Sequence, residues 1–172
     1  AVLTIEQGLK IYKSLEDYPR IVDGLNALAI AYSESGNFVK TFALDKQLAE
    51  LSQQIGSPLK IADQQFNLSY SYALFGQIEE STSLVLKAMQ TFQDYNDRGA
   101  IQNSYAMLAN NYFDSGDDEQ SISYYRKAIA LQDEVKMTSR LCNDLAAFSR
   151  PLRRAGHLGE AEQRLRQAID VG

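Results

Sequence analysis

The chain has 172 residues, of which 45% are hydrophobic, and this composition is typical of a folded domain rather than a disordered segment. Its longest apolar run, residues 27–32, falls far short of the ~18 residues that a membrane-spanning helix needs. The net charge of −5 disfavours binding to a nucleic-acid backbone, which depends on a basic face. We therefore expect no membrane span and no nucleic-acid partner.

The predicted elements follow a repeat of forty residues. Four glycines mark it, at Gly36, Gly76, Gly116 and Gly156. Leucines recur eight residues before the first three of these glycines, and tyrosines recur four residues before them. These offsets follow helical periodicity, so each glycine is expected to end one helix just before a second helix begins.

Taken in chain order, the pattern predicts nine helices and no strand. They are expected at residues 2–16, 20–34, 38–55, 58–75, 78–95, 98–115, 118–135, 139–155 and 158–170. Ser57 and Pro58 are typical of a cap followed by the first helical residue, and Asp17 precedes a similar start. Asn37 and Asp117 are predicted to cap the helices that follow the turns. Pro151 is expected to bend or loosen the last turn of its helix.

The residues around two of the glycines resemble a known signature. The segments Leu25-x-x-Leu28-Ala29-x-x-Tyr32-x-x-x-Gly36 and Tyr105-x-x-Leu108-Ala109-x-x-Tyr112-x-x-x-Gly116 are similar to the tetratricopeptide repeat. The forty-residue period resembles the longer-repeat subclass of Pins-type adaptors and bacterial maltose-activator-type regulators. Departures from the signature are the absence of tryptophan, an acid at Asp45 in place of an apolar residue, and Leu152 in place of a tyrosine.

The resemblance covers essentially the whole chain as a single solenoid domain, 1–172, of a longer protein. It comprises a half repeat, 1–19, and the repeats 20–59, 60–99, 100–139 and 140–172. The resemblance implies an all-α, right-handed superhelix of antiparallel helix pairs, whose first helices line a concave groove. By register with the family, the candidate peptide-binding residues are Asn26, Ile30, Phe66, Asn67, Tyr70, Asn103, Met107, Asn110, Phe113, Arg150, Arg153 and Arg154.

These residue types suit peptide binding, although a second interpretation stays open for each group. Asparagine can both donate to and accept from a peptide backbone, or it can simply be solvated surface. The aromatic residues and Met107 can form apolar pockets, or they can pack between repeats. The three arginines can bind a carboxylate, or they can complement the dipole at the end of their helix.

The sequence carries no pattern typical of catalysis or cofactor binding. His157 is the only histidine and falls in a predicted turn, and the single Cys142 falls among apolar residues, where we expect it to be buried. No glycine-rich phosphate-binding loop occurs. We therefore predict no enzyme, no metal and no cofactor.

The predicted function is a non-catalytic module that binds a peptide or helix of a partner protein in its groove. The alternative is a sensory or regulatory segment of a larger bacterial signalling protein or transcription regulator. Residues 1–19 correspond to the second half of a repeat, so we also expect a homodimer formed through that N-terminal edge. The segment contains no targeting information, and we expect a cytoplasmic location.

Overall fold

The computed structural model describes residues 2–55, 57–135 and 141–171. Within these ranges it contains nine α-helices and no strand. The helices are α1 (Val2–Ser14), α2 (Tyr18–Glu34), α3 (Phe38–Ile55), α4 (Pro58–Leu74), α5 (Ile78–Asp94), α6 (Arg98–Ser115), α7 (Asp118–Val135), α8 (Leu141–Arg154) and α9 (Leu158–Val171). The predicted all-α helical repeat fold is confirmed. The predicted start of the eighth helix, at residue 139, lies outside the described residues.

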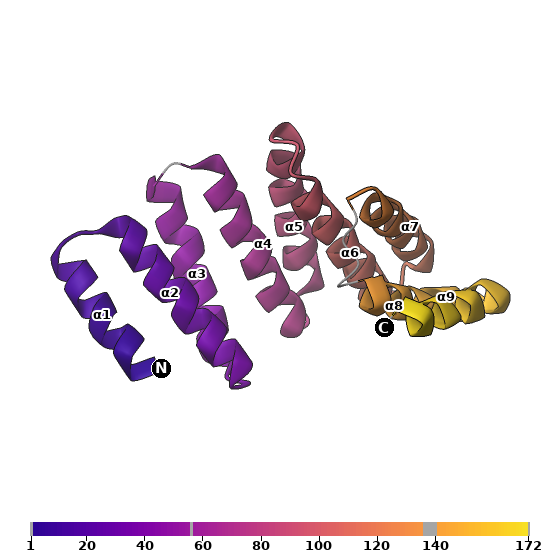
Figure 1. Cartoon of the computed structure of the whole chain (residues 1–172), viewed down its shortest axis with the longest axis horizontal. Helices are drawn as coiled ribbons and strands as arrows, with labels where there is room; N and C mark the ends of the chain where they lie inside the picture. The colour runs from indigo at the N-terminus through magenta and orange to yellow at the C-terminus, as the bar shows by residue number, and fades with distance from the viewer. Residues whose placement is uncertain (1, 56, 136–140, 172) are drawn as a thin grey trace. The chain divides into compact units, whose positions relative to one another are not determined.

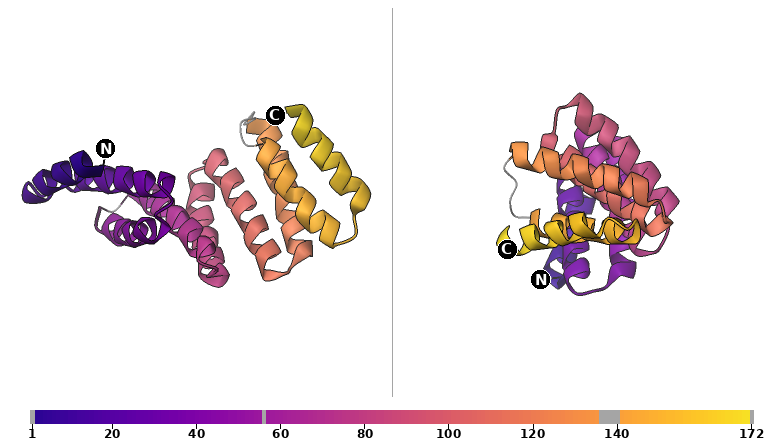
Figure 2. Two further views of the ribbon diagram at one scale, coloured as in Figure 1. Left: turned by 90° about the horizontal axis from the view of Figure 1, so that it is seen from below. Right: turned by 90° about the vertical axis from the view of Figure 1, so that its right-hand side faces the viewer.

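The chain divides into two compact units, Ala1–Ala88 (unit 1) and Met89–Gly172 (unit 2), and the division falls within α5. In unit 1, the helices α1, α2, α3 and α4 pack against one another in chain order (Figure 1). In unit 2, α7 packs on α6, α8 on α7 and α9 on α8, and α6 also contacts α8. Figure 2 shows α8 and α9 side by side and antiparallel. Each unit is thus a stack of helical hairpins.

Each unit has its own hydrophobic core, made by the apolar stripes that the helical periodicity predicts. In unit 1 the buried cluster consists of Leu9, Ile21, Val22, Leu25, Leu28, Ala29 and Leu48. In unit 2 it consists of Ala109, Ile122, Tyr125, Phe148, Leu152 and Ala161. Aromatic residues contribute more to the second cluster, which contains Tyr125 and Phe148 with their rings 5.3 Å apart. None of the helices in the described ranges combines the length and apolar character that a bilayer span requires.

The repeated glycines end helices in the same way in both units. Gly36 has a φ of 73° and Gly116 a φ of 92°, a left-handed conformation that glycine adopts without steric cost. The residue after each glycine donates its backbone N–H to the carbonyl four residues before that glycine, at 2.8 Å from Asn37 to Tyr32 and from Asp117 to Tyr112. This is the hydrogen bond of a Schellman motif, so the predicted corners are confirmed.

Most of the predicted helix starts are also confirmed. The carboxylate of Asp117 accepts a hydrogen bond from the backbone N–H of Gln120 at 3.0 Å, and Asn37 makes the same contact with Lys40 at 3.3 Å. Asp17 caps α2 through Arg20 N–H at 3.3 Å. Ser57 differs, because it occupies the cap position of α4 while its hydroxyl makes no capping bond. Pro58 supplies the fixed φ at that start instead.

One expectation needs correction, that for Cys142, and the surroundings of Pro151 are now defined. Cys142 is half-buried rather than buried. The helix α8 continues through Pro151 to Arg154, and the buried Pro151 carbonyl accepts a hydrogen bond from Ala155 N–H at 2.9 Å. The proline lies inside the helix, where it removes one backbone donor, and it is buried in unit 2; the expected bend or loosening of the last turn stays a prediction.

Candidate functional site

Five of the predicted binding residues lie on the first helices of unit 1, α2 and α4. Ile30 and Tyr70 are exposed, at 59% and 53%, and stand at the same position of successive repeats. Asn67 is also exposed, whereas Asn26 and Phe66 are half-buried. Large apolar side chains that remain this exposed after folding are available to pack against another molecule. Unit 1 therefore presents apolar and amide groups, without a cation among these five residues.

The predicted residues of unit 2 form a more closely connected cluster around Phe113, at the end of α6. The guanidinium carbon of Arg154 lies 4.1 Å from the centre of the Phe113 ring, and that of Arg150 lies 4.9 Å from it. Both arginines come from α8. Phe113 thus carries two cations near its π system, an arrangement that is attractive and that orients both guanidinium groups.

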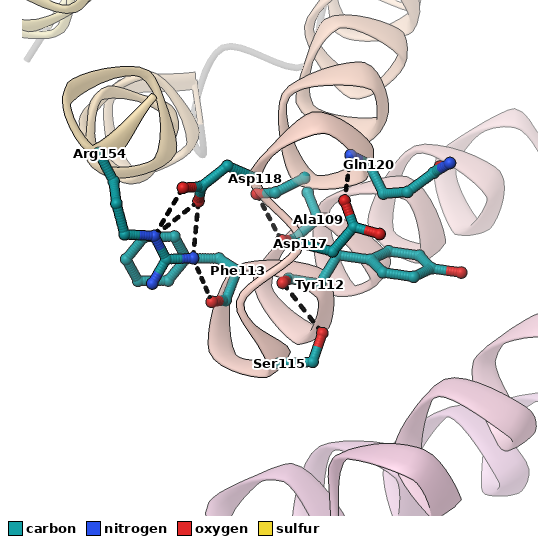
Figure 3. Close-up of polar contacts among 9 residues, drawn as sticks. Ala109, Tyr112, Phe113, Ser115, Asp117, Asp118, Gln120 and Arg154 are labelled. Atoms are coloured by element: carbon teal, nitrogen blue, oxygen red, sulfur yellow. Dashed lines mark hydrogen bonds and ion pairs between the residues drawn. The ribbon is translucent and has the colours of Figure 1, made fainter. Parts of the chain in front are cut away.

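Arg154 is held by the protein itself (Figure 3). Its Nε donates to both carboxylate oxygens of Asp118, at 2.8 and 2.7 Å, and its NH2 group donates to the Phe113 carbonyl at 2.7 Å. Asp118 is in the first turn of α7, so the ion pair joins α7 to α8. The hydrogen bond to the Phe113 carbonyl joins α8 to α6. The Asp118 hydrogen bond raises the pKa of Arg154 further, and the guanidinium stays charged. Its donors are largely used within unit 2.

Arg150 is tied to the cluster through Asn110. Its NH2 group donates to the Asn110 side-chain oxygen at 2.9 Å, and the Tyr125 hydroxyl donates to the same oxygen at 2.7 Å. The Asn110 amide donates to the Ala106 carbonyl at 3.0 Å. Burial raises the pKa of Tyr125 to about 12, although the nearby Arg150 lowers it. Tyr125 is therefore a neutral hydrogen-bond donor at physiological pH.

Three further predicted residues lie on the same two helices, α6 and α8. Arg153 is exposed in the last turn of α8, where a cation also complements the helix dipole. Asn103 and Met107 are half-buried on α6. Within the described part of the chain, Arg154 is paired with a carboxylate, whereas Arg150 and Arg153 are exposed predicted residues without such a pair.

Sequence reasoning did not identify two residues that organise this surface. Tyr125 lies on a second helix, and only its distance to Asn110 shows that its hydroxyl reaches the first-helix face. Asp118 stands in the first turn of α7, and the structure shows it paired with Arg154 at 2.6 Å. The signal available in the sequence was the i to i+36 pairing of an acid and a base across one repeat, which is weak without coordinates.

Comparisons with known proteins identify the fold. The family model described as "Tetratricopeptide repeat" matches residues 102–134, which contain most of α6 and α7. The chain has the tetratricopeptide repeat fold. No curated protein sequence matches the chain significantly. The family match places the Asn110 and Phe113 surface on the first helix of a tetratricopeptide repeat.

Solved structures of the same fold cover nearly the whole chain. The TPR-like repeats of a protein described as a kinesin light chain from Podosopora anserina align with a TM-score of 0.77 and 19% identity, over 99% of this chain and 84% of that one. BtubC from P. vanneervenii aligns with a TM-score of 0.70 and 16% identity, over 99% and 89%. A Rap protein solved with competence and sporulation factor aligns with a TM-score of 0.69 and 16% identity, over 99% and 57%. At these identities the likeness shows the fold alone.

Proposed function

We propose that this chain is a non-catalytic protein-interaction module, and that the exposed first-helix surface of unit 2 binds a peptide or helix of a partner protein. The observation that carries the proposal is the Phe113 cluster, in which an exposed Arg150 is fixed beside an aromatic ring and an amide. Prepositioned arginine and aromatic groups are typical of the residues that dominate binding energy. The fold supports this role because its repeats generally serve as interaction scaffolds.

The chemistry of the surface favours a partner segment that carries a carboxylate next to an apolar side chain. Arg150 has guanidinium donors beyond the one that bonds Asn110, and Arg153 stands three residues further along the same helix. A guanidinium fork matches a carboxylate in two parallel hydrogen bonds. The half-buried Phe113 offers apolar contact beside Arg150, and the half-buried Met107 lies on the same helix as Phe113. In unit 1, the exposed Ile30 and Tyr70 offer apolar contact of their own on α2 and α4, and Asn26, Phe66 and Asn67 lie on the same two helices.

The test combines site-specific crosslinking with charge reversal. A photoreactive amino acid placed at Arg153 should crosslink a partner protein in cells, and mass spectrometry of the crosslinked peptide identifies the bound segment. With that segment as a synthetic peptide, Arg150→Glu should weaken binding at least about tenfold, because an attraction is replaced by a repulsion. Arg166→Glu, an exposed arginine on α9, is the matched control. Equal affinities of both variants and the unaltered protein would contradict the proposal.

A second candidate function has specific support from two proteins of the same fold. One is a Rap protein solved as a complex with competence and sporulation factor, and another is a signal-transduction ATPase described as having a tetratricopeptide repeat sensor. These descriptions favour a regulatory segment within a larger signalling protein.

Three further expectations stay predictions: membership of the Pins-type or maltose-activator-type subclass, a cytoplasmic location and self-association. A full-length sequence with an attached ATPase or DNA-binding domain would favour the second candidate.

A further inference from the structure

A cleft of about 420 Å³ lies within unit 2, between the end of α5 and the helices α6 and α7. Small-molecule sites in proteins have volumes of about 300–1,000 Å³, so the cleft is large enough for a small ligand. Part of its lining is apolar, namely Ile101 and Tyr105 from α6 and Ala130 and Leu131 from α7. Ile101, Tyr105 and Leu131 are half-buried, so folding leaves part of their apolar surface available to a ligand.

Two cations line the same cleft from different helices. Arg98 comes from the first turn of α6 and Lys127 from the middle of α7, and both residues are exposed. The Lys127 Nζ lies 4.6 Å from the centre of the Tyr124 ring and 5.8 Å from that of the Tyr105 ring. These rings attract the ammonium group and hold it beside the cleft, but they carry no negative charge that would neutralise it. The cleft thus combines apolar side chains with positive charge.

Amide side chains complete the polar part of the lining. Gln93 is in the last turn of α5, and Asn96 is in the turn that follows. The described residues that line the cleft include no acid. Asp97 stands between Asn96 and Arg98 in the sequence, and its carboxylate caps α6 by accepting the Ala100 N–H at 3.0 Å. Amide N–H groups can donate to the oxygens of an anion, so the lining suits an acidic ligand.

The corresponding repeat position in unit 1 carries acids instead. Two repeats earlier, Glu16 stands in place of Asn96 and Glu50 in place of Ala130. Glu16 and Asn96 have the same positive φ of 52°. The repeat therefore accommodates an acid at this turn, and the difference in unit 2 is one of side chains rather than of backbone.

The two cations also distinguish unit 2 at this position. The register places Tyr18 where unit 2 has Arg98, and Gln47 where it has Lys127. The position thus changes from net negative in unit 1 to net positive in unit 2, on the same helical framework. Local positive charge raises the concentration of anions at a surface, so the cleft of unit 2 suits an anionic ligand.

We propose that this cleft binds a small organic anion. Its acidic group pairs with Arg98 and Lys127, and its apolar or aromatic body packs on Ile101 and Tyr105. Guanidinium and ammonium groups both bind carboxylates and phosphates, so the acidic group is one of these two. The site shares no residue with the Phe113 cluster and is independent of the peptide binding proposed above.

The test uses four probes that separate the charge of the ligand from its body. Phenylbutyrate and phenylethyl phosphate carry both, phenylbutanamide carries the body alone, and acetate carries the charge alone. In NMR spectra of the full chain, either of the first two at millimolar concentration should shift the backbone resonances of residues 93–105 and 127–131. Phenylbutanamide and acetate should leave these resonances unchanged. The tighter of the two acids identifies the acidic group that the cleft prefers.

The first variant introduces the acid that unit 1 carries. Ala130→Glu should weaken phenylbutyrate binding at least about tenfold, because the new carboxylate repels the anion and competes for Lys127. Ala130 is exposed, so the substitution does not disturb the core. Gln120→Glu adds the same charge at another exposed position of α7, outside the lining, and should leave the affinity unchanged.

The second variant removes one cation. Lys127→Gln should weaken phenylbutyrate binding about threefold or more, the effect of losing an exposed ion pair. Lys87→Gln, at the exposed equivalent position one repeat earlier, is the matched control and should have no effect. The proposal is overturned if neither acid shifts the resonances, if phenylbutanamide or acetate shifts them equally, or if the shifts survive Ala130→Glu.

Discussion

The repeat after Gly36 in unit 1 and the repeat after Gly116 in unit 2 place different chemistry at one position, the ninth residue after the corner glycine. In unit 1 this residue is Asp45, which is 6% exposed and accepts a hydrogen bond from the Ser71 hydroxyl of α4 at 2.5 Å. In unit 2 it is Tyr125, which is fully buried and connects α7 to Asn110 of α6 and Phe148 of α8. One backbone position thus holds a buried carboxyl or a buried phenol.

This difference shows that one repeat position can contribute very differently to the stability of the fold. Tyr125 contributes a large apolar surface, and its hydroxyl is satisfied by the surface residue that also holds Arg150. Asp45 contributes little apolar area, and burial raises the pKa of its carboxyl, although the Ser71 hydrogen bond lowers it. We infer that unit 2 gains stability at this position and that unit 1 gives some up.

The largest expected effect comes from removing the phenol. Tyr125→Ala should lower the free energy of unfolding by about 3–5 kcal/mol, because it leaves a cavity where a fully buried ring was packed. Chemical denaturation measures the loss, and hydrogen exchange should locate it in α6, α7 and α8. Tyr125→Phe keeps the ring and should cost only about 1 kcal/mol, since Arg150 still bonds the Asn110 oxygen. Similar losses for both variants would show that the hydroxyl, not the ring, stabilises unit 2.

An intermediate effect tests whether the corners of the two units are equivalent. Gly36→Ala and Gly116→Ala each place a Cβ on a backbone with positive φ, at a cost of about 1–2 kcal/mol. No neighbouring atom lies within 4 Å of either new Cβ, so the cost is conformational and should be the same in both units. Thermal unfolding of each variant gives the comparison. A difference of more than about 1 kcal/mol would break the equivalence of the repeats.

The smallest effect concerns Asp45 and depends on pH. A carboxyl whose pKa is raised by folding binds its proton more tightly in the folded state, so the stability it contributes falls as pH rises from its ordinary pKa to the raised value. Asp45→Asn removes this charge while keeping an acceptor for Ser71. It should raise the unfolding midpoint at pH 7 by roughly 1–3 °C.

The pH profile distinguishes this mechanism from a general effect of charge. The advantage of Asp45→Asn over the unaltered chain should shrink as pH falls through the same window, because Asp45 is then neutral as well. Asp23→Asn, at an exposed carboxyl of unit 1, serves as the control and should leave the profile unchanged. A constant advantage of Asp45→Asn from pH 3 to pH 8 would contradict a raised pKa of Asp45 in the folded chain.

The fold could be predicted from the sequence because its signals are local and repeat. Gly36 and Gly116 mark helix ends through a backbone conformation, and Asp117 marks a helix start through a bond to its own third neighbour. These interactions join residues within a few positions of one another. Helical periodicity then identifies the buried face, and the described helices end within two residues of the predicted bounds.

The details of the candidate site could not be predicted in the same way. Whether Arg154 is free to bind a ligand depends on Asp118, and whether Asn110 is available depends on Tyr125. These pairs join different helices, and their distances depend on how closely the helices approach. The unusual acid at Asp45 was visible in the sequence, but only the structure identifies Ser71 as its partner.

The uniform corners have a consequence for how such a chain can change length. A segment of forty residues cut between two corner glycines begins and ends in the same backbone conformation, so unequal recombination can add or delete it with both joints intact. A gain or loss of a single residue inside a helix would instead rotate everything after it by about 100° and turn its buried stripe toward water. Homologues of this protein should therefore differ in length by whole repeats of forty residues.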